Sequence, residues 1–131
     1  MPTLFTRIIN REIPGRFVYE DELCVAFLTV APIRPGHTLV VPRAEFDHWL
    51  DMPEDLTAHL FVTAQKISRA IQTAFPCKKV GLMIAGLEVP HVHLHLTPID
   101  SIADMDFGHQ DAKALPEALD AAANAIRAAL G

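Results

Sequence analysis

The sequence is poor in cysteine and lacks long apolar runs. Its two cysteines, Cys24 and Cys77, stand far apart without a Cys-x-x-Cys pair, which excludes a zinc knuckle and a dense disulfide framework. There is no run of eighteen apolar residues, and the start has no signal-peptide hydrophobic region, so we expect a cytoplasmic protein without a membrane segment. Repeats and low-complexity stretches are missing too, which favours one domain over residues 1–131.

Positive charge is also scarce. Eleven Lys and Arg residues face sixteen Asp and Glu residues, for a formal net charge of -5. A nucleic acid polymer is therefore not an expected partner, because nonspecific binding to phosphate chains depends on clustered basic side chains. A small anionic ligand stays open, since backbone amides, helix termini and a few histidines can hold one phosphate group.

The pattern of apolar residues predicts an α+β domain. Half of the 131 residues are hydrophobic, which suffices for a buried core. Helical spacing is clearest over Pro53–Ala74, where Asp51 and Glu54 have capping-box spacing. The other predicted elements are a short helix or turn over 4–9, strands over 16–20, 24–30, 37–42, 80–85 and 91–97, and a C-terminal helix over about 111–130. Several antiparallel strands with few helices are typical of α+β folds.

The segment His91-Val92-His93-Leu94-His95-Leu96 alternates strictly between histidine and apolar residues. In a strand this period of two places the three histidines on one face and the apolar residues on the other. Successive histidines would then have Cα atoms roughly 7 Å apart. We interpret the histidine row as a chemical site, because packing does not explain three imidazoles in a line.

Two other interpretations apply to histidines in this sequence. His48, His59 and His109 are isolated, and we assign them no role, as for most single surface or core histidines. The row could also hold zinc, because histidines two apart on a strand can reach one ion, but the outer pair lies too far apart to share a tetrahedron easily. We predict no metal or other cofactor, and a zinc-dependent hydrolase stays as an alternative.

Phosphoryl chemistry suits a row of imidazoles. With an ordinary pKa near 6.5, a neutral imidazole offers a lone pair as nucleophile while protonated neighbours supply positive charge. A nucleophilic side chain can divide a displacement at phosphorus into two easier steps, and positioned donors stabilise the charge on the equatorial oxygens.

The sequence resembles the histidine triad (HIT) superfamily, whose members hydrolyse or transfer nucleotides. The segment His91–Leu96 matches its His-x-His-x-His motif with apolar x, and three upstream segments are similar to the family in the expected order. These segments are Leu4–Pro14, Tyr19–Asp21 with Ala26–Leu28, and Pro35–Pro42. The resemblance covers residues 4–98 and implies a mostly antiparallel sheet of about five strands, one long central helix and a C-terminal helix.

The resemblance also implies roles for particular residues. His93 would be the nucleophile that forms a covalent nucleotidyl-imidazole, with its tautomer set by the His91 carbonyl. His91 and His95 would flank the phosphate, and His37 would lie close by on the neighbouring strand. The nucleoside would lie among apolar residues that could equally be plain core, with Thr29 where the family has a ribose-binding Asp. These residues are Leu4, Phe5, Ile8, Phe27, Thr29 and Val30.

The connection before the triad departs from the family pattern. Residues 83–90 have no Asn, and Leu87 and Glu88 stand where a Gln and a hydroxyl residue are expected. A carboxylate near a bound phosphate is unfavourable unless it turns away or is protonated. Three interpretations of Glu88 stay open: repulsion of phosphate, a catalytic part toward the leaving group or a protonated His95, and a solvated surface residue.

The predicted function is cleavage of a nucleotidyl bond at the α-phosphorus. A nucleoside phosphoramidate or a dinucleoside polyphosphate would be the substrate, and a purine nucleotide is the expected ligand. The alternative is a nucleotide-binding or regulatory HIT module with little turnover. The resemblance further implies a homodimer, and the apolar stripe of Pro53–Ala74 could serve a partner or the core of its own chain.

Overall fold

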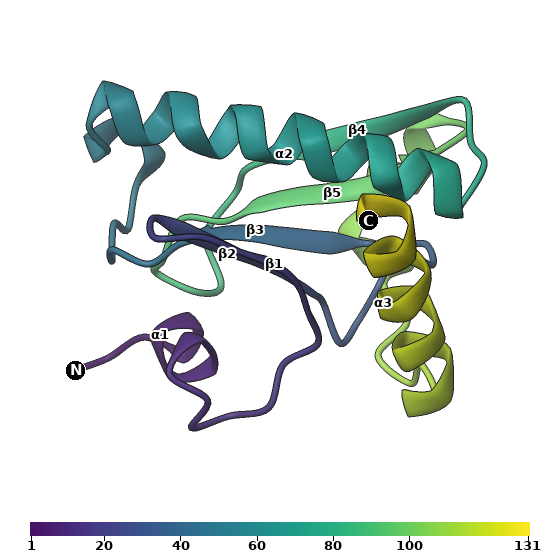
Figure 1. Cartoon of the computed structure of the whole chain (residues 1–131), viewed down its shortest axis with the longest axis horizontal. Coiled ribbons are helices and arrows are strands. Elements are labelled where there is room, and N and C mark those ends of the chain that lie inside the picture. Colours follow the sequence, from purple (N-terminus) through teal and green to yellow (C-terminus); the bar gives the residue numbers. More distant parts are fainter.

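A computed structural model of the protein describes all residues, 1–131, and contains one five-stranded sheet (Figure 1). The strand order is β1-β2-β3-β5-β4, and all neighbouring strands are antiparallel. This arrangement confirms the predicted α+β fold. The strands are β1 (Phe17–Glu20), β2 (Cys24–Leu28), β3 (Thr38–Pro42), β4 (Lys79–Met83) and β5 (Leu94–Ile99).

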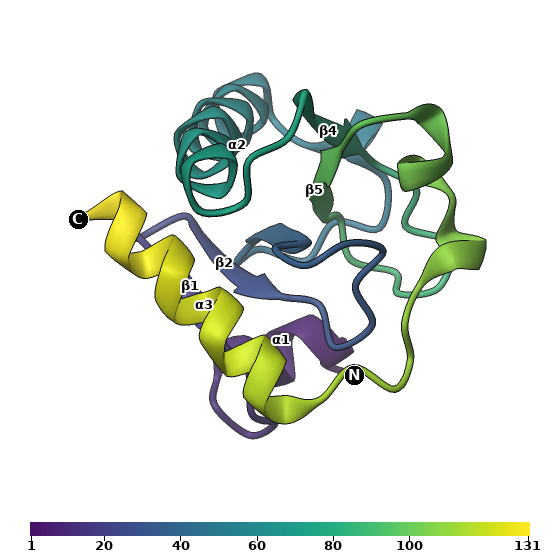
Figure 2. The ribbon, with the colours of Figure 1, turned by 90° about the vertical axis from the view of Figure 1, so that its right-hand side faces the viewer.

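Helices cover both faces of the sheet (Figure 2). The long helix α2 and the C-terminal helix α3 pack together on one face, and the short helix α1 lies on the other. None of the helices combines the length and the apolar character that a membrane crossing requires. The helices are α1 (Leu4–Ile9), α2 (Glu54–Ala74) and α3 (Pro116–Leu130), with short 3-10 turns at Trp49–Asp51, Ile102–Met105 and Phe107–His109.

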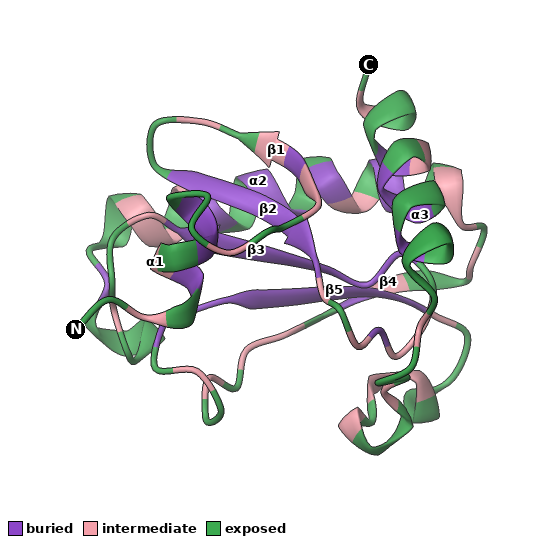
Figure 3. Cartoon of the chain, turned by 90° about the horizontal axis from the view of Figure 1, so that it is seen from below, coloured by how far each residue is buried: buried purple, intermediate pink, exposed green.

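Alternation along the strands divides the buried residues into two cores. In β2, Cys24 and Ala26 face α2 and α3, whereas Val25 and Phe27 face α1. The core on the α2 side contains seventeen buried residues and the core on the α1 side seven. The α1 face of the sheet is therefore less completely covered and can carry a site. The central strands β2, β3 and β5 are buried almost throughout, whereas the edge strands β1 and β4 are partly exposed (Figure 3).

Two helix starts differ from the prediction. Pro53 is the N-cap of α2, without a side-chain hydrogen bond, and Asp51 ends the preceding 3-10 turn, so the predicted capping box is absent. Helix α3 begins at Pro116 and not near residue 111. Proline favours the first helical position because its φ is already helical and its missing N–H is not needed there.

The strand predicted over 91–97 begins only at Leu94. Before it, the Val92 N–H donates to the Phe46 carbonyl at 2.7 Å, and the His91 N–H donates to the Val89 carbonyl at 2.8 Å. These bonds take the chain away from β3, whose pairing with β5 extends only to Leu94. His91 and His93 therefore lie in the segment that enters the sheet.

Candidate active site

His93, directly before β5, and His95, within it, lie on the α1 side of the sheet. Leu94 and Leu96 point into the α2 core together with Val92, as predicted. His95 lies on the opposite face, and the His93 ring lies next to it with the two ring centroids 4.7 Å apart. Alternation in an antiparallel strand thus presents two imidazoles to the α1 side.

The His93 ring is held in one tautomer. Its Nδ1 lies 2.8 Å from the His91 carbonyl oxygen, and because a carbonyl only accepts, Nδ1 carries the proton. The other ring nitrogen, Nε2, has no protein partner and keeps its lone pair. The edge of the Phe5 ring packs against this imidazole with the ring centroids 4.8 Å apart, which fixes its orientation beside α1.

A chain of hydrogen bonds fixes His95 in the same way. The Ile33 N–H donates to His37 Nδ1 at 3.1 Å, so the neutral His37 ring carries its proton on Nε2. That nitrogen lies 2.9 Å from His95 Nδ1 and donates to it. His95 is left with its Nε2–H as a donor that no protein group accepts, on a ring that lines the cavity described below.

His91 lies differently from the prediction. Its side chain is fully buried and does not line the cavity. The ring Nε2 lies 2.7 Å from the Pro42 carbonyl oxygen, to which it donates, and Nδ1 accepts from the Thr3 hydroxyl at 2.6 Å. The His91 ring therefore does not border the cavity, because His91 precedes the regular strand, and its backbone carbonyl instead accepts from His93 Nδ1.

All four histidines are poor bases in this environment. Burial, together with a smaller effect of neighbouring histidines, lowers the pKa of His37 to about 4 and that of His95 to about 3. Burial also lowers the pKa values of His91 and His93. The rings are therefore neutral at pH 7, and the protonated neighbours expected from the sequence are replaced by neutral N–H donors.

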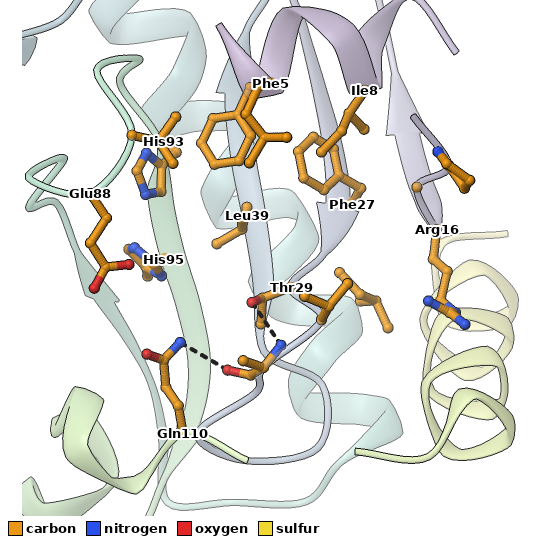
Figure 4. Close-up of a pocket in the computed structure, with 17 residues that line it drawn as sticks. Phe5, Ile8, Arg16, Phe27, Thr29, Leu39, Glu88, His93, His95 and Gln110 are labelled. Carbon is orange, nitrogen blue, oxygen red and sulfur yellow. Dashed lines mark hydrogen bonds between the residues drawn. The ribbon is translucent and has the colours of Figure 1, made fainter. Parts of the chain in front are cut away.

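An apolar cavity of about 280 Å³ opens beside His93 and His95 (Figure 4). Helix α1, the loop that follows it, the end of β2 and the residues after β2 form much of its wall, and every residue predicted to surround the nucleoside lines it. The Phe5 and Phe27 rings meet edge to face with centroids 5.6 Å apart. The predicted residues in the wall are Leu4, Phe5, Ile8, Phe27, Thr29 and Val30.

A second, smaller cavity of about 110 Å³ adjoins the first. Both cavities are lined by Glu88, His93, His95 and Gln110. In Figure 4 the Glu88 side chain lies on the side of the site where His93 and His95 lie. Phe107 closes the other side, with its ring centroid 4.8 Å from that of His95.

Several residues that line the two cavities were not identified from the sequence, and three of them have polar or aromatic side chains. Arg16 lies at the end of the larger cavity and is paired with Asp120 at 2.7 Å. Gln110 donates from Nε2 to the Ala31 carbonyl at 2.9 Å, and Phe107 belongs to the same C-terminal segment. No sequence motif marks these residues, because only the fold of the chain brings them to the cavities beside the triad.

The isolated histidines lie outside this site. His59 pairs with Asp21 at 2.7 Å, His48 caps a 3-10 turn, and His109 bonds to the Ala103 carbonyl. Asp21, Cys24 and His59 have ligand atoms within 4.8 Å of one another, on the α2 side of the sheet. The ring nitrogens of the triad do not converge in this way.

The fold and the site together define a small α+β protein with paired neutral histidines beside a nucleoside-sized apolar cavity. The HIT domain family model matches residues 10–102. The chain belongs to the HIT family, which includes nucleotide-binding proteins and hydrolases.

Three relatives place the chain within this family. An uncharacterized HIT-like protein of Methanocaldococcus jannaschii is 37% identical over 105 residues, which cover 72% of this chain and 77% of that protein. The bifunctional bis(5'-adenosyl)-triphosphatase/adenylylsulfatase of Arabidopsis thaliana is 34% identical over 90 residues, 65% of this chain and 50% of that protein. A Hit-like protein of Bartonella henselae has a crystal structure that superposes with a TM-score of 0.81 at 30% identity, covering 97% of this chain and 95% of the other.

Proposed function

We propose that the protein cleaves a nucleotidyl bond at the α-phosphorus of a purine nucleotide through a covalent His93 intermediate. Nucleoside phosphoramidates and dinucleoside polyphosphates are the proposed substrates. The main support for this proposal is the state of His93: Nδ1–H is bound to a carbonyl, and the Nε2 lone pair is free beside an apolar cavity.

In the first step, His93 Nε2 attacks the α-phosphorus and forms a P–N bond. The bond from phosphorus to the leaving group breaks, and its electron pair goes with the leaving group. A phosphoramidate nitrogen takes up a solvent proton beforehand and departs as the neutral amine. The Nδ1 proton stays on the imidazole, where the His91 carbonyl stabilises the positive charge that develops on the ring.

In the second step, water attacks the same phosphorus and the P–N bond to His93 breaks. The nucleoside monophosphate leaves, Nε2 regains its lone pair, and the proton of the water goes to solvent. His95 contributes its Nε2–H to a phosphate oxygen throughout, without changing its own protonation. Two displacements of this kind are the usual benefit of a nucleophilic side chain.

A panel of nucleotidyl substrates, combined with mass spectrometry of the quenched protein, tests the proposal. We expect turnover of at least one phosphoramidate or dinucleoside polyphosphate and a nucleotidyl mass increment on the peptide that contains His93. Turnover without any such increment in rapidly quenched samples, together with full activity of His93→Ala, would rule out the covalent route.

The second candidate is a nucleotide-binding module with little turnover. It is favoured by one observation: the connection over residues 83–90 contributes Leu87 and Glu88 to the site and no neutral side-chain donor. Saturable binding of adenosine or guanosine monophosphate, without an adduct or turnover on the panel, would support the module.

A further inference from the structure

We propose that the smaller cavity receives a positively charged leaving group and that Glu88 is its counter-ion. This inference rests on the proposed function, because it assigns a chemical class to the group that departs from the phosphorus. The negative charges that need balancing are those of the reacting phosphate and of Glu88. The apolar residues of the nucleoside pocket supply no positive charge to balance them.

The charged side chains of the two cavities are few. Arg16 and Glu88 are the only charged residues among the lining side chains other than histidine. Arg16 already pairs with Asp120 at 2.7 Å, and Figure 4 shows it at the opposite end of the larger cavity from Glu88. Glu88 forms no ion pair with any basic side chain of the chain.

Glu88 acts on the reacting group itself. Its carboxylate raises the pKa of His93, against the larger lowering effect of burial, as expected of a negative charge close to the ring. A nucleotide whose phosphate lay on His93 would bring a second negative charge to this place. With no protein cation between them, the two charges repel, and a substrate that carries its own positive charge removes the conflict.

The position of the smaller cavity fits the leaving group. Because both cavities share His93 and His95, a phosphate on His93 borders both. A nucleoside in the larger cavity then leaves the other substituent of the phosphorus to the smaller one. The volume of about 110 Å³ suits a short chain that ends in a charged group.

The walls favour an organic cation over a hydrated metal ion. Ala85, Leu87 and Phe107 line the same cavity as Glu88 and supply apolar surface there. Methylene groups of an alkylammonium can pack against such surface, as they do along lysine side chains. Magnesium keeps several of its waters and gains nothing from apolar neighbours.

Three matched substrates test this proposal. Adenosine 5'-phosphoramidates of 1,2-diaminoethane, propylamine and β-alanine have leaving groups of similar length that end in an ammonium, a methyl group and a carboxylate. The experiment compares kcat/KM for each substrate, in the presence of EDTA, between wild type and Glu88→Gln. The control variant is Glu22→Gln, which changes an exposed glutamate away from the site. The ratio between variants cancels the intrinsic reactivity of each amine.

We expect the ammonium-to-methyl ratio of kcat/KM to fall about tenfold on Glu88→Gln and to stay unchanged in Glu22→Gln. The carboxylate substrate should gain on Glu88→Gln for the same reason. If Glu88→Gln changes kcat/KM by the same factor for all three substrates, the carboxylate does not interact with the charge of the leaving group and the proposal is wrong.

Binding separates this proposal from the proposed function. In a His93→Asn background the substrates remain intact, so calorimetry can compare their affinities between the single variant His93→Asn and the double variant His93→Asn/Glu88→Gln. A preference for the ammonium compound that disappears in the double variant supports the counter-ion role even if wild type turns over none of the three. Equal affinities of the single variant for the ammonium and methyl compounds, or a preference that the double variant retains, overturn it.

Discussion

At the scale of single residues, the site works through tautomers that its neighbours impose. A carbonyl holds the proton of His93 on Nδ1, and the Ile33 N–H holds that of His37 on Nε2. Because Nδ1 of His93 carries the proton, its Nε2 has a free lone pair. Because His37 donates from Nε2 to His95 Nδ1, His95 carries its own proton on Nε2. Neutral imidazoles can thus act as nucleophile and donor side by side.

The nucleophile can be tested directly. His93→Asn is expected to lower kcat by at least about a thousandfold, since it removes the attacking atom, while the affinity for adenosine monophosphate changes by less than about threefold. Steady-state kinetics and calorimetry measure the two. His95→Ala, which leaves the attacking atom of His93 in place, should keep measurable activity, and near wild-type turnover in His93→Asn would contradict the role of His93.

Glu88 gives a second prediction for a ligand without a leaving group. Because its carboxylate repels phosphate, Glu88→Gln is expected to tighten adenosine monophosphate binding by about threefold to tenfold. Calorimetry in low salt measures the change, and raised salt should reduce it through screening. Unchanged affinity together with unchanged turnover would identify Glu88 as solvated loop surface.

The buried histidines make stability depend on pH. The pKa values of His37 and His95, about 4 and about 3, lie below the value of about 6.5 in an unfolded chain. As the pH falls below 6.5 the unfolded state binds protons first, so the free energy of unfolding decreases by up to about 1.4 kcal/mol per pH unit for each histidine until its folded pKa is reached.

Urea unfolding between pH 7.5 and 4.5 measures this dependence. His95→Gln should show a shallower decrease than wild type, because one of the titrating groups is gone. His48→Gln, which changes an exposed histidine, is the matched control and should follow wild type. Parallel curves for wild type and His95→Gln would contradict the link between burial and stability.

At the scale of elements, α1 joins the larger cavity to the triad. Thr3 caps this helix by accepting from the Thr6 N–H at 3.1 Å, and its hydroxyl donates to His91. Glu45 accepts from the Thr3 N–H and from the Thr6 hydroxyl. The helix that supplies Phe5 therefore also positions the residue whose carbonyl holds His93.

Removing the Thr3 hydroxyl should disturb both ends of this connection. Thr3→Val leaves His91 Nδ1 buried without a donor, and we expect a loss of about 1 to 3 kcal/mol in stability and about tenfold in kcat. The ring nitrogen chemical shifts of His91 and His93 report the tautomers by NMR. Thr57→Val, which removes a hydroxyl bonded to the Pro53 carbonyl in α2, is the control and should leave those shifts unchanged.

At the scale of the whole molecule, the long helix uses its apolar stripe within its own chain. Leu60, Ala64, Ile67 and Ile71 are buried in the larger core. Other apolar side chains stay partly exposed, two on α2 and one on the edge strand β4. They are Phe61 at 38%, Val62 at 66% and Leu82 at 40%.

We predict a homodimer that buries this remaining surface, since an exposed edge strand next to apolar side chains favours pairing with another chain. Light scattering at low micromolar concentration should give about twice the chain mass of 14.4 kDa. Phe61→Glu/Val62→Glu should shift the mass toward the monomer, whereas Phe107→Ala, in the site, should not. A wild-type mass of 14.4 kDa alone would reject the dimer.

The kinds of elements and the faces of the strands could be predicted from the sequence. Strict alternation suffices to place Val92, Leu94 and Leu96 in the core, because the strand period of two leaves no other arrangement when one face is buried. Helix boundaries depend on local competition at Pro53 and Pro116, and sequence patterns located them only to within a few residues. The resemblance to the family also named the nucleoside-pocket residues that the structure gathers around one cavity.

The state of the histidines, by contrast, depends on tertiary packing. Their burial, which lowers the pKa values, depends on distant segments, since Phe5 packs against His91 and His93 and Phe107 against His95. The His91 tautomer depends on Thr3 and Pro42, and that of His95 on His37, tens of positions away. The tautomers of His93 and His37, by contrast, depend on groups two and four residues away. The position of the His91 ring and the approach of Phe107 likewise follow from long-range packing. Such contacts form between residues tens of positions apart, and neither periodicity nor motif spacing carries information about which distant donor or acceptor a given ring nitrogen will meet.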